Sequence, residues 1–210
     1  MAIASILTPA AIARLAPGSP LLGATSQVLE GIVTEAQLLA ESPEAAARPL
    51  EQSEFRDVFS VCMGNIITPH YFPLSQQRPP FVELPNPRGA GKVKDWVPTQ
   101  DWRFTRRGEI RLINVPRVYE ARVAYVAGFD FDQPEAGTED MVDEILLNIL
   151  AIAEQCYDTY QALERGGTFR ADKLYSVKVA APGRFGALKA KSDAAMRNLR
   201  KLRPGYGPLD

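Results

Sequence analysis

Residues 122–131 read Arg-Val-Ala-Tyr-Val-Ala-Gly-Phe-Asp-Phe. The alternation in this stretch places Val123, Tyr125 and Ala127 on one face of a β-strand. Gly128 follows, and glycine has the backbone freedom that ends a strand. An acidic segment and a long amphipathic helix come next in the chain. The stretch is typical of a junction that organises a small domain and carries no catalytic signature.

The length and composition predict a soluble globular protein. A chain of 210 residues accommodates one core with an insertion, whereas two full-sized domains would be cramped. The apolar fraction of 46% is ordinary, and no apolar run reaches the roughly 18 residues that a membrane span requires. The apolar N-terminus lacks a basic segment and is interrupted by Arg14, which argues against a secretory signal. We therefore expect a cytoplasmic site of synthesis.

Two helices are predicted before residue 53. Thr8-Pro9 starts the first, because the threonine hydroxyl can accept an orphan N–H and proline tolerates the first helical position. This helix should end near Ala16. The second should end near Ser42-Pro43, because the residue before proline is displaced from the helical region. Its apolar stripe comprises Leu22, Leu29, Ile32, Val33, Ala36, Leu39 and Ala40.

The segment from about Phe55 to Phe129 is predicted to be β-rich, because aromatic and β-branched residues alternate there and prolines are frequent. Trp102 to Leu112 reads as a hairpin that turns at Arg107-Gly108. The proline-rich stretch from Pro85 to Gly91 reads as a loop. The expected strands are Arg56 to Val61, Phe81 to Leu84, Trp102 to Thr105, Glu109 to Val115 and Ala121 to Ala127.

Thr138 is predicted to cap the longest helix of the chain, with Gly166 at its C-terminal end. A short strand from Tyr175 to Val179 and a final helix after Pro182-Gly183 follow, and that helix ends before Pro204. The apolar face of the long helix is formed by Met141, Ile145, Leu146, Ile149, Ala153, Cys156, Tyr157 and Tyr160. The sequence thus predicts an α+β, mainly α fold. It divides into a helical body, residues 1–52 and 130–203, a β-rich insertion, residues 53–129, and an extended tail, residues 204–210.

Charge is unevenly distributed, although the net charge is only −1. An acidic block without any basic residue comprises Asp130, Asp132, Glu135, Glu139, Asp140, Asp143 and Glu144. The C-terminal region has basic residues opposed only by Asp193: Arg184, Lys189, Lys191, Arg197, Arg200, Lys201 and Arg203. Opposite charge at two ends of one chain suits subunits that contact one another, and it equally suits two solvated helix faces.

Catalytic and metal-binding motifs are weak. His70 is the single histidine, which excludes a histidine-based metal cluster. The segment from Gly89 to Lys92 lacks the first glycine and the hydroxyl residue of a phosphate-binding loop, so it reads as a flexible hairpin end. Asp130 and Asp132 alternate like calcium ligands, but Pro134 occupies the third ligand position and leaves at most a weak cation site. We expect neither a cofactor nor a metal.

The two cysteines, Cys62 and Cys156, lie far apart in the sequence. Cys156 falls on the apolar face of the long helix, where a free thiol behaves as a small hydrophobic group. A structural disulfide is therefore not expected.

The order of these elements resembles that of the head–tail adaptor, or connector, proteins of tailed bacteriophages. In that family two N-terminal helices precede a β-rich insertion whose last strand reads like Val-x-Tyr-x-Ala-Gly-Phe or Tyr, followed by an acidic or proline-bearing link and a long helix. Here Val123 to Phe129 stands in that position, Pro134 lies in the link, and Met141 to Leu163 forms the helix. The hairpin that begins at Asp101 is similar to the hairpin of the family.

The resemblance implies a virion structural protein without enzymatic activity. Such adaptors form a ring, typically of twelve subunits, beneath the portal in the neck of the virion, where they join the capsid to a tail or neck protein and let DNA pass. The portal-docking candidates are Arg197, Arg200, Lys201, Arg203, Tyr206 and Leu209. The candidates for a subunit interface or for the lumen are Asp130, Asp132, Glu135, Glu139, Asp140 and Asp143.

Two other classes of function remain open from the sequence. One is a small cytoplasmic enzyme that uses carboxylates in a cleft beside Tyr157 or His70. The other is a nucleic-acid-binding protein that acts through the basic final helix.

Overall fold

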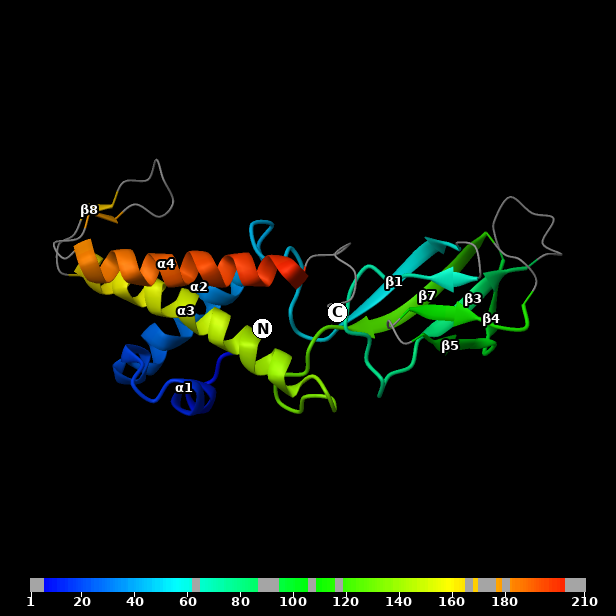
Figure 1. The fold of residues 1–210 in the computed structure, drawn as a ribbon, viewed down its shortest axis with the longest axis horizontal. Coiled ribbons are helices and arrows are strands. Elements are labelled where there is room, and N and C mark those ends of the chain that lie inside the picture. The colour runs from blue at the N-terminus through cyan, green and yellow to red at the C-terminus, as the bar shows by residue number, and fades with distance from the viewer. Residues whose placement is uncertain are drawn as a thin grey trace. The chain divides into compact units, whose positions relative to one another are not determined.

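The computed structural model describes residues 6–61, 65–86, 95–105, 109–115, 119–164, 168–169, 177–178 and 182–202. The fold is α+β, with two antiparallel sheets inserted between N-terminal and C-terminal helices (Figure 1). The chain divides into a helical unit, Met1–Arg48 with Ala136–Arg203, and a β unit that spans Pro49–Glu135. These boundaries lie a few residues from the 52/53 and 129/130 positions that the sequence predicts.

The N-terminal helices begin and end close to their predicted positions. Helix α1 spans Pro9–Leu15, and the Ala11 N–H donates to Thr8 Oγ1 at 3.2 Å, which confirms the predicted cap. Helix α2 spans Ser26–Glu41 and buries most of its predicted stripe. The assignment of Leu22 to that stripe is wrong, because the short 3₁₀ helix η1, Pro20–Gly23, buries Leu21 and leaves Leu22 exposed.

Helix α3, Glu139–Glu164, is the centre of the helical unit and packs against α2 and α4. Helix α4 spans Pro182–Leu199 and continues into the 3₁₀ helix η2, Arg200–Leu202. Between α3 and α4, the strands β8, Thr168–Phe169, and β9, Val177–Lys178, pair antiparallel. Gly166 and residues 203–210 lie outside the described part of the chain. The buried face of α3 includes Val142, Ile145, Leu146, Ile149, Leu150, Ile152, Ala153 and Tyr157.

The β unit contains a four-stranded and a three-stranded antiparallel sheet. In the first sheet the strands lie in the order β1 (Ser53–Ser60), β7 (Glu120–Ala127), β3 (Phe81–Pro85) and β4 (Trp96–Thr99). In the second sheet the order is β2 (Ile66–Ile67), β6 (Ile110–Leu112) and β5 (Trp102–Phe104). All five predicted strands are present. The sequence missed β2 and β4, which are short and, for β4, interrupted by Pro98.

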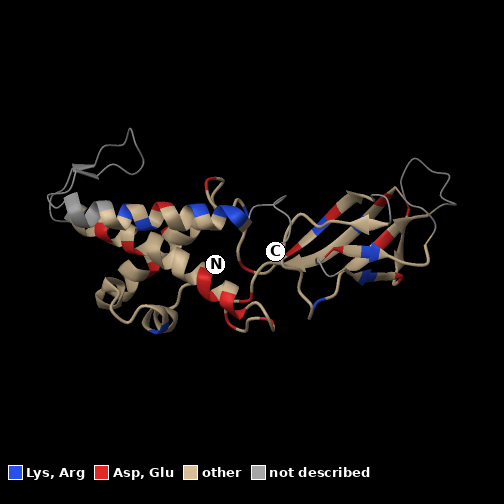
Figure 2. Ribbon diagram, in the orientation of Figure 1, with Lys and Arg blue, Asp and Glu red and all other residues tan. Residues whose placement is uncertain are grey.

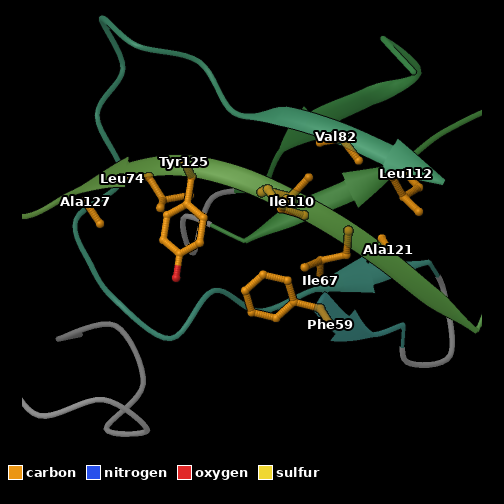
Figure 3. Packing of buried hydrophobic residues seen from close by; sticks show 10 residues of the cluster. Phe59, Ile67, Leu74, Val82, Ile110, Leu112, Ala121, Tyr125 and Ala127 are labelled. Atoms are coloured by element: carbon orange, nitrogen blue, oxygen red, sulfur yellow. The ribbon is translucent and has the colours of Figure 1, made fainter. Parts of the chain in front are cut away.

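The core of the β unit lies on the face of β7 that the alternation predicts. Val123, Tyr125 and Ala127 are buried in one cluster with residues from both sheets, among them Phe59 and Ile110 (Figure 3). The predicted hairpin is present, and Trp102 pairs with Leu112 and Phe104 with Ile110. The residues of its turn, 106–108, lie outside the described part of the chain.

Candidate interaction surfaces

The link between β7 and α3 uses its carboxylates to hold its own backbone. Asp130 Oδ1 accepts hydrogen bonds from the N–H groups of Asp132, at 3.0 Å, and Gln133, at 2.8 Å. Glu135 accepts from Ser75 Oγ at 2.5 Å, from the Gln76 N–H at 2.9 Å and from Gln52 Nε2 at 3.2 Å. Two members of the acidic block therefore act inside the β unit.

At the start of α3, two further members of the block have partners within the helical unit. Glu139 Oε2 accepts from the Gly137 N–H at 2.7 Å. The Asp143 carboxylate receives two hydrogen bonds from the Arg14 guanidinium, at 2.6 and 2.8 Å, which join α1 to α3. These hydrogen bonds lower the pKa of Asp143 and raise that of Arg14. Both side chains are about half exposed, so this pair contributes little to stability.

Three members of the acidic block remain available to a partner. Within the described residues, the carboxylates of Asp132, Asp140 and Glu144 are exposed and form no hydrogen bond or ion pair. Asp140, Glu144 and Leu147 follow the i, i+4, i+7 spacing of one helix face, and Leu147 is 47% exposed. This α3 face thus combines two negative charges with an apolar side chain. Figure 2 shows acidic residues at the start of α3 and basic residues along α4.

The basic C-terminal residues lie partly within the described chain. Arg197, at the end of α4, and Lys201, in η2, are exposed. Arg200 is also exposed, and its Nε donates to the Glu44 backbone carbonyl at 2.6 Å, which ties η2 to the segment after α2. The remaining portal-docking candidates, Arg203, Tyr206 and Leu209, lie outside the described residues.

The residues considered for an enzyme belong to different units. His70, in the β unit, is exposed, and its ring centroid lies 5.0 Å from that of Phe59. Tyr157, in the helical unit, is buried as a core residue of α3. Among the described residues, no group of three or more His, Cys, Asp or Glu side chains is arranged to hold a metal ion.

The sequence did not reveal a buried carboxylate on the outer face of the four-stranded sheet. Glu83 on β3 is 6% exposed and accepts two hydrogen bonds at 2.6 Å from Arg122, its cross-strand partner on β7. Arg56 on β1 reaches the same carboxylate at 3.3 Å. The guanidinium carbon of Arg122 also lies 5.2 Å from the centroid of the Trp96 ring. The hydrogen bonds from Arg122 are the main reason that the pKa of Glu83 is lowered.

A second buried polar group lies on the inner face of the same sheet. The Tyr125 hydroxyl donates to Asp57 Oδ2 at 3.0 Å, while its ring packs near those of Phe55 and Phe59. Burial, and next the hydrogen bond to Asp57, raise the pKa of Tyr125. Asp57 thus points inward from β1, which is an edge strand of the sheet. Inward-pointing charged residues on edge strands are known to protect against edge-to-edge aggregation.

Two exposed arginines, Arg103 on β5 and Arg111 on β6, are direct cross-strand partners. The sequence carries a signal for this pair. Once the hairpin from Trp102 to Leu112 is placed with its apolar residues inward, the alternation puts both arginines on the outer face.

Comparison with known proteins does not identify the chain. No model of a known protein family matches the sequence, and no curated protein matches it. Across the described part of the chain, none of the helices is long and apolar enough to cross a membrane.

Proposed function

We propose that the protein is a head–tail adaptor of a tailed bacteriophage, a virion structural protein that forms a ring beneath the portal, joins the capsid to the tail and lets DNA pass. The order of the elements carries this proposal. Two N-terminal helices precede a β unit whose last strand ends at Gly128, and an acidic link then leads into a long helix and a C-terminal helix. The adaptors that the sequence resembles have the same order.

The helical unit supplies the body of the proposed subunit, because α3 packs against α2 and α4 and is tied to α1 by Asp143. A neighbouring subunit would contact the exposed α3 face formed by Asp140, Glu144 and Leu147. Asp130, Glu135, Glu139 and Asp143 already have partners within one subunit. Of the six candidates for an interface or for the DNA-repelling lumen, Asp132 and Asp140 therefore remain, and we add Glu144, a further exposed member of the acidic block.

The C-terminal region is the proposed portal-docking arm. Arg197 and Lys201 present exposed positive charge at the end of α4, and the sequence continues to Tyr206 and Leu209. A basic and apolar arm that orders on binding would tie two rings together. The arm would have to bind without losing the hydrogen bond from Arg200 to the Glu44 carbonyl, or exchange that bond for a contact to the portal.

Co-sedimentation with the portal protein encoded in the same genome tests the proposal. The full chain should sediment with the portal as a complex of defined stoichiometry. A chain lacking residues 203–210, with Arg197 and Lys201 replaced by glutamate, keeps the buried Leu199 and should fold, as judged by circular dichroism, and fail to co-sediment. Full-affinity binding of the truncated chain would contradict the assignment of the arm, and no binding by the full chain would contradict the adaptor function.

Exposed lysines on α4 favour a second candidate, a nucleic-acid-binding protein that acts through this helix. Lys189 and Lys191 are exposed, with Arg197 nearer the C-terminal end. Binding through these charges would weaken steeply with salt. Replacement of Lys189 and Lys191 by glutamine would then reduce DNA binding, and unchanged DNA binding would exclude this candidate.

A further inference from the structure

Two arginines face each other on the outer side of the three-stranded sheet. The Thr105 N–H donates to the Glu109 carbonyl and the Ile113 N–H donates to the Asp101 carbonyl, each at 2.8 Å. By the alternation of an antiparallel ladder, Arg103 and Arg111 form a hydrogen-bonded pair, whose Cα atoms stand about 5.5 Å apart. The apolar residues of both strands point the other way, into the core.

The charges of this pair are not compensated by an ion pair within the described part of the chain. Like charges directly opposite each other across two strands are destabilising, yet neither guanidinium has an ion pair or a side-chain hydrogen bond among the described residues. Two carboxylates share this face. Glu109 accepts instead from the hydroxyls of Thr68, at 3.3 Å, and Thr105, at 3.4 Å. Asp101 is exposed and forms no ion pair with either arginine. The sheet therefore holds two arginines side by side, and neither forms an ion pair among the described residues.

We propose that Arg103 and Arg111 bind the phosphate backbone of duplex DNA. A guanidinium donates through a planar fork that matches a phosphate group, and two forks on adjacent strands can hold neighbouring phosphate oxygens. The sequence between them contains two further arginines, Arg106 and Arg107, so four of the nine residues from 103 to 111 are arginine and one is acidic. Such a local excess of positive charge suits a polyanion better than an isolated carboxylate.

The inference goes beyond the proposed ring, because it concerns the affinity of the free protein for DNA and holds with or without a portal. It also differs from DNA binding through α4, since it assigns the contact to the β unit. The contact would be independent of base sequence, because phosphates carry no sequence information.

The experiment measures binding of the full chain to a fluorescently labelled 20-base-pair duplex by anisotropy across a series of salt concentrations. The R103Q/R111Q variant should bind more weakly, and its slope of log K against log salt should be shallower by about 1.8, the value for two lost phosphate contacts. K189Q/K191Q removes the same charge from α4 and should keep the wild-type slope. D101N should bind more tightly, because it removes the unpaired carboxylate from the arginine face.

Two outcomes would overturn the inference. Equal losses from R103Q/R111Q and K189Q/K191Q would show that only net charge matters. Competition by poly-glutamate as effective as that by unlabelled DNA of equal charge would indicate an acidic protein as the partner.

A stability measurement separates loss of binding from loss of folding. R111E places opposite charges across β5 and β6, so its thermal midpoint should rise while its DNA binding weakens. A lower midpoint for R111E would contradict the like-charge pair on which the inference rests.

Discussion

Gly128 lies directly against the backbone of Glu51. A Cβ atom at position 128 would stand 2.5 Å from the Glu51 carbonyl oxygen, and the φ angle of Gly128 is +116°. Next to this contact, the Gln52 N–H donates to the Phe129 carbonyl at 3.1 Å and the Phe129 N–H donates to the Leu50 carbonyl at 2.9 Å. The end of β7 is thus joined to the chain that enters β1, and only glycine fits at the point of closest approach.

Replacement of Gly128 by alanine should destabilise the β unit by about 3 kcal/mol, because the unfavourable φ and a clash with backbone atoms act together. Gly137→Ala is the matched control. Gly137 has a φ of +87°, but no atom lies within 4 Å of a Cβ built there. Its replacement by alanine should therefore lower the free energy of unfolding by only about 1 kcal/mol. Urea unfolding measures both values. Equal destabilisation by the two variants would show that the contact with Glu51 is unimportant.

The buried carboxylate Glu83 should make the β unit sensitive to acid. Its folded pKa is lowered from the ordinary value of 4.5, chiefly by the hydrogen bonds from Arg122. The stabilisation that the ionised Glu83 carboxylate provides is therefore complete when the pH lies above the pKa of Glu83 in the unfolded chain. It is lost as the pH falls through the lower pKa of Glu83 in the folded protein. Glu83→Gln should lower the free energy of unfolding by about 2 kcal/mol at pH 7. This value allows for the solvent that reaches both arginines and weakens their attraction for the carboxylate.

The pH profile of urea unfolding tests this role of Glu83. The difference in stability between the wild type and Glu83→Gln should shrink as the pH is lowered from 5 to 3. A difference that stays constant over that range would assign the effect of the substitution to packing instead of to charge. Glu54→Gln, at an exposed position of β1, serves as the control and should show no such difference.

Cys156 should be unreactive in the folded protein. Burial raises the pKa of this thiol to about 12, with a further contribution from Glu35, so almost no thiolate forms at neutral pH. In a Cys62→Ser background, Ellman's reagent at pH 8 should label Cys156 only after denaturant is added. Rapid labelling without denaturant would show that α3 opens readily or that the thiol is accessible.

The α3 face formed by Asp140, Glu144 and Leu147 should contribute to ring formation. Reversal of both charges, in D140K/E144K, should weaken self-association, since a neighbouring subunit would meet two positive charges in place of two negative ones. E30K/D193K changes the same amount of charge at exposed positions of other helices and should assemble normally. Light scattering measures the assembly, and unchanged oligomers of D140K/E144K would exclude this face.

Local patterns in the sequence predicted the helices and the principal strands, because their signals lie within a few residues. The 3.6-residue period defined α2 and α3, the Thr8 cap defined the start of α1, and Gly128 marked the end of β7. Strand β4 escaped prediction, because Pro98 and its short length remove the alternation on which the prediction depends.

The functions of the charged residues were less predictable, because their partners are distant in the sequence. The sequence predicts Asp143 for a subunit interface or for the lumen, yet its partner Arg14 lies 129 positions away in the same chain. Glu135 depends in the same way on Ser75, 60 positions away. Glu83 carries no motif, and only the register of β3 against β7 places it beside Arg122. Such pairings require the three-dimensional fold.

Electron microscopy of the protein mixed with its portal tests the adaptor function most directly. Particles of the mixture should show a second ring, stacked coaxially on the portal and following its rotational symmetry, that is missing from particles of the portal alone. Portal particles that remain unchanged at a large excess of the folded protein would contradict the account.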